Sequence, residues 1–194
     1  MKYNFFAYMA RMKYIRRWGL MKSVTEENIA EHSAQVAQLA HALALICNKK
    51  FGGNLDADRI CTMALYHETS EVMTGDLPTP IKYYNPEIRK SYKDIEHTAN
   101  ERLIAMLPEE FRADYRELIE VDTDSHEHMI IKAADKISAY VKCVEEMQSG
   151  NREFAMAQKA LRKELEAYQR LPEVDWFCKT YLDTFSQTLD EMGS

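Results

Sequence analysis

The chain has 194 residues, of which 46% are hydrophobic and 29% charged, a balance typical of an ordinary globular protein. Its formal net charge of −6 disfavours a binder of duplex nucleic acid, because such a protein needs a broad basic face. Only six Gly and five Pro leave little room for the turns of an all-β fold.

The cysteines indicate a reducing compartment. Cys47, Cys61, Cys143 and Cys178 are scattered through apolar, helical-looking stretches without a CxxC pair, which favours buried, reduced thiols. The N-terminal segment has dispersed charges and no apolar signal-peptide core, and no apolar run approaches the ~18 residues of a membrane span. We therefore expect a cytoplasmic protein with neither a membrane nor a nucleic-acid polymer as its partner.

Two helices are predicted in the first 48 residues. Residues 4–15 form an amphipathic helix that ends before an Arg-Arg-Trp-Gly break. A second helix is predicted over residues 29–48, and its inward stripe places His32 one turn before Val36. That stripe continues through Leu39, Ala40, Leu43 and Ile46.

A third helix carries ionisable side chains on its inward face. It is predicted over residues 57–74 without a break, with Asp56 as its N-cap. The spacing of three and four residues places His67 and Glu71 on the same side as its apolar residues. Two prolines stiffen the loop at residues 75–80 that follows.

The rest of the chain is also predicted to be helical. Asp135 borders an apolar stripe in a long helix that starts at residue 126. Short connections imply neighbouring helices packed antiparallel or at bundle-like angles. We expect an all-α fold, a bundle of about seven to eight helices that forms one domain over residues 1–194. The remaining predicted helices cover residues 87–106, 109–120, 126–149, 152–170 and 173–191.

The inward ionisable groups suggest a metal centre. His67 and Glu71 are costly on a core face unless they are hydrogen-bonded, paired or bound to metal. With His32 and Asp135, three helices offer nitrogen and oxygen ligands that suit Mn²⁺, Co²⁺, Fe²⁺ or Zn²⁺. From spacing alone, hydrogen-bonded core histidines explain the pattern equally well. The HExxH motif of zinc proteases is incomplete, because Glu71 stands where its second histidine belongs.

The other histidines and one lysine are assigned no function. His41, His97, His126 and His128 are expected to be exposed to solvent, the last two because they point apart at a predicted helix start. For Lys82, contact with a phosphate and full solvation both stay open.

Three segments resemble the bacterial 5′-deoxynucleotidases of the HD-domain superfamily, and the likeness runs through most of the chain. They are RRWGLMKSVTEENIAEHS, YHETSEVMTGDLPTPIKY and IKAADKISAYVKCVEE, in which the TGDLPTP loop beside an H-[D/E]-x-x-E segment is the most specific part. The resemblance implies a helical homodimer that hydrolyses deoxyribonucleoside 5′-monophosphates to deoxynucleoside and phosphate. It also implies one divalent metal ion, with Co²⁺, Mn²⁺, Zn²⁺ and Fe²⁺ as candidates.

The same resemblance implies a role for each matching residue. Glu71 matches the catalytic acid or base and Arg17 the residue that orients the phosphate. Trp18 matches a side chain that lies against the sugar and disfavours a 2′-hydroxyl. The implied metal ligands are His32, His67, Glu68 and Asp135. The expected substrate-binding residues are Arg17, Trp18, His32, Glu68 and Asp135 together with the enclosing loop Asp76, Leu77, Pro78 and Thr79.

One position departs from the superfamily pattern. The signature pair is His-Asp, whereas position 68 is Glu, whose carboxylate reaches one methylene further. Such a carboxylate either keeps the metal by tilting or changes the metal preference or the rate. Two alternatives therefore stay open: an HD-domain phosphohydrolase for another small phosphate ester, and a nucleotide-binding protein whose activity is attenuated through Glu68.

Overall fold

The computed structural model describes residues 3–82 and 84–193, and within these ranges all regular elements are helical. The expected all-α class is confirmed. One isolated antiparallel bridge, between Arg16 and Asn28, pairs the two ends of the loop that precedes the central helix. No helix in the described part of the chain is long and apolar enough to cross a membrane.

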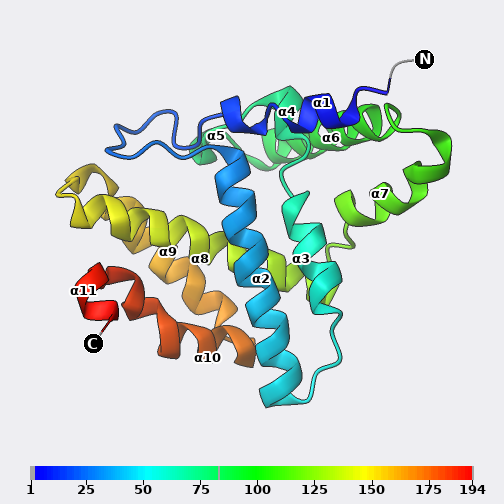
Figure 1. Cartoon of the computed structure of the whole chain (residues 1–194). Helices are drawn as coiled ribbons and strands as arrows, with labels where there is room; N and C mark the ends of the chain where they lie inside the picture. Colours follow the sequence, from blue (N-terminus) through cyan, green and yellow to red (C-terminus); the bar gives the residue numbers. More distant parts are fainter. Residues whose placement is uncertain (1–2, 83, 194) are drawn as a thin grey trace.

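A central helix, α2 (Ile29–Phe51), organises the larger part of the molecule (Figure 1). It packs against α3 (Ala57–Leu65), α8 (His126–Gln148) and α10 (Pro172–Tyr181), while α9 (Ala155–Tyr168) packs on α8. The apolar core shared by these helices includes Val36, Leu43, Ile60, Ile130, Ile137, Leu165 and Val174.

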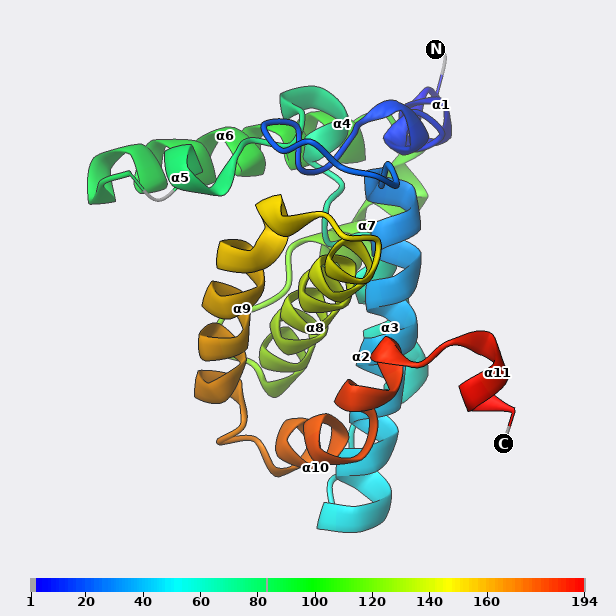
Figure 2. The same cartoon turned by 90° about the vertical axis from the view of Figure 1, so that its left-hand side faces the viewer.

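A second group of helices lies across the N-terminal end of α2, at the top of Figure 1. It consists of α1 (Phe5–Met9), α4 (Glu71–Thr74), α5 (Thr79–Lys82) and α6 (Pro86–Ile104), and α7 (Arg112–Ile119) follows. Figure 2 shows the same layering from the side. This group has its own small core, made of Phe5, Leu103, Ile104, Leu107 and Ile119.

The start of α2 is fixed by its capping residues. Oδ1 of Asn28 accepts hydrogen bonds from the backbone amides of Ala30 and Glu31, both at 3.0 Å, and the Glu31 carboxylate accepts from the Asn28 amide at 3.3 Å. This capping box holds His32 in the first turn of the helix, on its buried side. The helix ends at Phe51, three residues later than predicted, and its C-cap residue Gly52 has a φ of 72°, which is favourable for glycine.

The prediction of one unbroken helix over residues 57–74 is wrong. The helix stops at residue 65 and resumes at Glu71, with turns between. In that break the Thr69 hydroxyl donates to the carbonyl three residues before it at 2.7 Å, and Nδ1 of His67 lies 2.7 Å from the carbonyl of Ala64. These side-chain bonds compete with the regular helical pattern, so His67 and Glu71 do not share one continuous helical face.

The structure has more short elements than the seven to eight helices expected. The predicted helix 4–15 is divided into α1 and a 3₁₀ turn at Met12–Tyr14, and the predicted helix 173–191 into α10, a 3₁₀ turn at Leu182–Ser186 and α11 (Leu189–Met192). Short 3₁₀ turns at Glu109–Phe111 and Arg152–Phe154 precede α7 and α9.

Candidate active site

Four side chains that are far apart in sequence converge where the N-terminal end of α2 meets the upper group of helices. His32 comes from the first turn of α2, His67 and Glu68 from the break between α3 and α4, and Asp135 from the middle of α8. One nitrogen or oxygen atom from each lies within 4.8 Å of the corresponding atom of the others. The structure thus brings together all four residues predicted as metal ligands.

Hydrogen bonds determine which nitrogen of His32 faces this cluster. Nδ1 lies 3.0 Å from Oγ of Ser138, which itself donates to Oε1 of Gln35 at 2.5 Å. Because the Ser138 hydroxyl donates its proton to Gln35, the serine oxygen can only accept a hydrogen bond from His32, so Nδ1 of His32 carries the proton. The unprotonated nitrogen is then Nε2, which lies 3.1 Å from Oδ1 of Asp135.

His67 is oriented in the same way. Its Nδ1 lies 2.7 Å from the carbonyl oxygen of Ala64, and since a carbonyl only accepts, Nδ1 carries the proton. Nε2 is buried without a hydrogen-bond partner among the described residues and lies 3.3 Å from Oε1 of Glu68. Both imidazoles are thus oriented by a hydrogen bond at Nδ1 and leave the lone pair of Nε2 free, which is the usual arrangement of metal-binding histidines.

The charges in the cluster also suit a cation. Burial, with the charge of Arg17, lowers the pKa of His32, which favours the neutral ring. Burial alone would raise the pKa of Glu68 and of Asp135, but the neighbouring imidazoles, His67 for Glu68 and His32 for Asp135, lower both pKa values, and so does the charge of Lys132 on α8. Two carboxylates beside two imidazoles therefore give the cluster a negative charge that fits one divalent ion.

Glu71 lies beside this set as a fifth buried ionisable group. Its side chain is 1% exposed, and burial together with the charge of Glu68 raises its pKa to about 9. Oε1 of Glu71 lies 2.9 Å from Nζ of Lys82 on α5, and Oε2 has no hydrogen-bond partner within residues 3–82 and 84–193. Lys82, left open by the sequence, is therefore an ion-pair partner of Glu71 rather than a solvated side chain.

Arg17 and Trp18 are held by one carboxylate. Oε2 of Glu27 accepts from Nε of Arg17 and from Nε1 of Trp18, each at 3.0 Å. Trp18 has a φ of 60°, uncommon for a residue other than glycine, and its ring lies 5.3 Å from that of Phe154. The charges of Asp135 and Glu68 act on Arg17, so the guanidinium borders the cluster.

A buried ion pair on α8 anchors the loop that carries these two residues. Nζ of Lys142 lies 2.6 Å from Oε1 of Glu146, and both side chains are almost wholly buried. The Glu146 carboxylate also accepts from the backbone amides of Val24 at 2.8 Å and Thr25 at 3.1 Å. The loop between α1 and α2 is therefore tied to α8 through its backbone.

The loop predicted to enclose the nucleoside follows α4. Asp76, Leu77 and Pro78 are half-buried. Burial raises the pKa of Asp76 although the charge of Arg17 acts in the opposite direction, which places this carboxylate near the same cation. Thr79 begins α5, and its side chain lies outside the described part of the structure.

Sequence reasoning missed Glu27 and Glu146 and left the role of Lys82 open, although all three hold the predicted residues in place. Two carried a weak signal, since Glu27 directly precedes the N-cap of α2 and Lys142 and Glu146 have the i, i+4 spacing of a helical ion pair. Lys82 and Glu71 are 11 residues apart, a spacing that does not indicate that their side chains pair.

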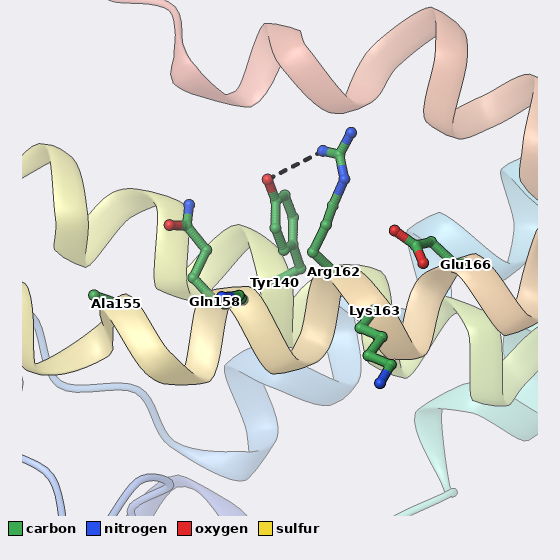
Figure 3. Close-up of a pocket in the computed structure, with 7 residues that line it drawn as sticks. Tyr140, Ala155, Gln158, Arg162, Lys163 and Glu166 are labelled. Atoms are coloured by element: carbon green, nitrogen blue, oxygen red, sulfur yellow. Dashed lines mark hydrogen bonds between the residues drawn. The ribbon is translucent and has the colours of Figure 1, made fainter.

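A separate groove of about 540 Å³ lies along α9 and contains none of these residues (Figure 3). In it, Arg162 donates to the hydroxyl of Tyr140 at 3.3 Å. Its other lining residues are Ala155, Gln158, Lys159, Lys163 and Glu166.

Comparison with known sequences identifies close relatives. The model of the family described as 5′-deoxynucleotidase YfbR-like matches residues 4–185. A 5′-deoxynucleotidase of Vibrio vulnificus is 55% identical over 191 residues, which cover 98% of each chain. One of Photobacterium profundum is 53% identical over 197 residues and 99% of each chain. One of Yersinia pestis is 50% identical over 98% of this chain and 96% of its own.

Solved structures agree with the fold. An HD-domain phosphohydrolase from Listeria innocua superposes with a TM-score of 0.84 at 23% identity, covering 98% of this chain and 92% of its own. A cyanophage S-2L HD phosphohydrolase, described as bound to dA and one catalytic Zn²⁺, superposes with a TM-score of 0.64 at 20% identity, covering 92% and 96%. At these identities the likeness concerns the fold alone.

Proposed function

Because the chain belongs to the 5′-deoxynucleotidase YfbR-like family, we propose that it is a metal-dependent 5′-deoxynucleotidase that releases phosphate from deoxyribonucleoside 5′-monophosphates. The observation that carries this proposal is the convergence of His32, His67, Glu68 and Asp135 beside Arg17. It occurs in a chain at least half identical to 5′-deoxynucleotidases over nearly its full length.

We further propose that the four converging residues hold one divalent metal ion. Two Nε2 atoms with free lone pairs and two carboxylates support this assignment, and the set suits Co²⁺, Mn²⁺, Zn²⁺ or Fe²⁺. When bound, such an ion polarises a phosphate oxygen and lowers the pKa of a coordinated water.

In this proposal Glu68 takes the place of the aspartate of the signature pair. Its Oε1 lies 3.3 Å from Nε2 of His67, so both atoms can contact the same metal ion. The extra methylene is accommodated because His67 and Glu68 lie in an irregular turn, where a small backbone change adjusts the reach of a side chain.

Arg17 and Glu71 carry the proposed chemistry of the chain itself. The guanidinium of Arg17 offers donors matched to phosphate oxygens, and Glu27 fixes its direction. Lys82 holds Oε1 of Glu71, so Oε2 remains for moving a proton at the attacking water or the leaving 5′-oxygen.

Specificity for the deoxyribose is assigned to Trp18. Its indole is held at both ends, by Glu27 at Nε1 and by Phe154 at the ring, so it forms a rigid wall beside Arg17. A rigid wall excludes an additional 2′-hydroxyl better than a mobile side chain does. The loop at residues 76–79 is proposed to enclose the nucleoside.

We also propose that the enzyme is a single-domain, cytoplasmic homodimer. One apolar core includes side chains from Val36 to Leu182, which supports a single domain. Large apolar side chains are exposed in the N-terminal region, among them Leu20 at 73% and Val24 at 62%, and these would gain from burial in a dimer. The mass of the protein in solution, measured by light scattering, tests the dimer.

A substrate panel tests the proposed activity. Phosphate release is measured from the four common deoxyribonucleoside 5′-monophosphates, from their ribonucleotide counterparts and from sugar phosphates, with Co²⁺ or Mn²⁺ present. The proposal expects turnover of the deoxyribonucleotides above the other two groups. A preference for a sugar phosphate would identify another small ester as the substrate, whereas thermal stabilisation by dAMP without phosphate release would identify a nucleotide-binding protein.

A further inference from the structure

A second cluster of potential metal ligands lies at the opposite end of α2. One ligand atom each from Cys47, His126 and Glu173 lies within 4.8 Å of the others. Cys47 is separated from His32 by about 22 Å along the helix, at ~1.5 Å per residue. Figures 1 and 2 both place α10 beside the C-terminal half of α2, away from α4 and α5. The cluster is therefore distinct from the candidate active site.

Three helix ends meet at this cluster. Cys47 lies in the last turns of α2, His126 is the first residue of α8, and Glu173 lies in the first turn of α10. A ligand that joined the three side chains would therefore tie together three helices of the main bundle.

The carboxylate of Glu173 is only half satisfied. The side chain is 0% exposed, and its Oε1 lies 2.6 Å from Nε2 of His126. Oε2 is buried and has no hydrogen-bond partner in the described part of the chain. Buried carboxylate oxygens are normally hydrogen-bonded, paired or bound to a cation, so this oxygen needs a partner that the described side chains do not supply.

The thiol of Cys47 is confined by the turn that follows α2. A Cβ atom on Gly53 would lie 2.5 Å from Sγ of Cys47, so any other residue at position 53 would displace the sulfur. The amide of Gly53 donates to the carbonyl of Cys47 at 3.2 Å, which fixes this turn against the helix. Burial, with the charge of Glu173, raises the pKa of the Cys47 thiol. The glycine thus leaves the sulfur in the position where it meets the carboxylate.

His126 does not have the full exposure expected from the sequence. Its ring is 37% exposed and paired with a buried carboxylate, so one side of the cluster reaches solvent while the other is closed. An ion can enter from that side, and a water molecule can occupy the remaining coordination position.

We propose that Cys47, His126 and Glu173 form a second divalent-metal site, of structural rather than catalytic function, that takes Zn²⁺. A thiolate, an imidazole and a carboxylate are typical zinc ligands, and the sulfur disfavours Mg²⁺ and Ca²⁺. On binding, Sγ releases its proton to solvent and the histidine binds as the neutral ring. The thiolate and the carboxylate then balance the two positive charges of the ion.

The absorption spectrum of the cobalt-substituted protein tests this proposal. The full chain is stripped of metal and titrated with Co²⁺, which takes the place of Zn²⁺ and gives a strong near-ultraviolet band when a thiolate is a ligand. The candidate active site contains no sulfur and contributes nothing to that band. We expect the band in the parent protein, its loss in Cys47→Ser, and its retention in Cys61→Ser, whose half-buried thiol on α3 is the matched control.

Two further variants separate the second site from the first and from a loss of folding. Asp135→Asn is expected to keep the band, because it alters only the candidate active site. Gly53→Ala keeps all three ligands but displaces the sulfur, so it is expected to need at least about tenfold more Co²⁺ for half of the band. Circular dichroism verifies that each variant is folded.

Zinc content gives an independent measurement. After dialysis against Zn²⁺, the parent protein and Cys61→Ser should each hold one zinc equivalent more than Cys47→Ser. No band at Co²⁺ concentrations that saturate the protein, an unchanged band in Cys47→Ser, or equal zinc content in the parent and Cys47→Ser would each overturn the proposal.

Discussion

The ammonium group of Lys82 lies 2.9 Å from Oε1 of Glu71, and this ion pair connects α5 to the first residue of α4. Glu71 is buried next to Glu68, whose negative charge disfavours a second ionised carboxylate close by. Lys82 compensates part of that cost and at the same time fixes the rotamer of Glu71. The pair thus explains how an acidic side chain is held in place without being a metal ligand.

Replacing Glu71 by alanine is expected to separate turnover from binding. The bound metal and the affinity for dAMP should be retained, while kcat falls at least ~100-fold, the usual scale for a lost acid or base. Lys82→Met should lower kcat less, by about tenfold, because it misplaces Glu71 without removing it, and Lys82→Arg should restore part of the loss. Steady-state kinetics and metal analysis measure both effects. A Glu71→Ala enzyme with the parent kcat would remove this residue from the mechanism.

Glu27 is expected to control both phosphate binding and sugar selectivity. In Glu27→Ala the Arg17 guanidinium and the Trp18 indole lose their shared acceptor, so the KM for dAMP should rise about tenfold, equivalent to ~1.4 kcal/mol. The ratio of dAMP to AMP hydrolysis should fall in the same variant.

Glu26→Ala is the matched control for this experiment. Glu26 pairs with Arg16 at 2.8 Å, but both side chains are largely exposed, so their ion pair contributes little. Equal effects of the two substitutions would show that Glu27 has no special function.

Substitutions of Glu68 distinguish an active metal-dependent enzyme from a nucleotide-binding protein with attenuated activity. If Glu68 is a metal ligand, Glu68→Ala should lower the metal content of the dialysed protein and abolish phosphate release, whereas Glu68→Asp should retain the ion because the carboxylate remains. Metal analysis and phosphate release from dAMP measure both variants. An inactive parent that gains activity as Glu68→Asp would instead favour the attenuated nucleotide-binding protein, and full metal content in Glu68→Ala would exclude a ligand role.

Glu146 is expected to make stability depend on acid pH. Burial alone would raise its pKa, but hydrogen bonds from Lys142 and the Val24 amide lower it to about 2, from an ordinary value of 4.5. A depressed pKa contributes stability above about pH 4.5, and this contribution is lost as the pH falls towards about 2. Glu146→Gln should lower the free energy of unfolding at neutral pH by about 3 kcal/mol, as expected when a buried pair is broken.

Urea unfolding at about pH 7 and about pH 3 measures this effect. The loss in Glu146→Gln should be clearly smaller at the lower pH, where the parent carboxylate has begun to lose its advantage. The neighbouring Glu145 is exposed, so Glu145→Gln serves as the control and should change stability little. A loss in Glu146→Gln that is the same at both pH values would contradict the assignment.

The long helices could be predicted from the sequence because their signals are local. The apolar stripes of α2 and α8 recur every three or four residues, and Asn28 and Gly52 mark the ends of α2 through their own backbone geometry. The break before Glu71 could not be predicted, because an inward histidine at the right spacing also fits an unbroken helix.

The residues that support the site depend on contacts between distant parts of the chain. Glu146 binds the amide of Val24, 122 residues away, and no periodic pattern relates the two positions. The candidate ligands could be named because the HD-domain pattern specifies them; their spacing alone left hydrogen-bonded core histidines equally possible. The contacts that assign a role to Glu27 and to Lys82 join them to Arg17, Trp18 and Glu71, and only the folded structure shows those contacts.

Phosphate release from dAMP and from AMP by the metal-stripped protein, before and after addition of Co²⁺, tests the central claim most directly. The account predicts no release from either nucleotide before addition. After Co²⁺ it predicts release that is faster from dAMP than from AMP and that is absent from the Asp135→Asn variant. Equal rates with and without the metal, or equal rates for the two nucleotides, would contradict a metal-dependent 5′-deoxynucleotidase.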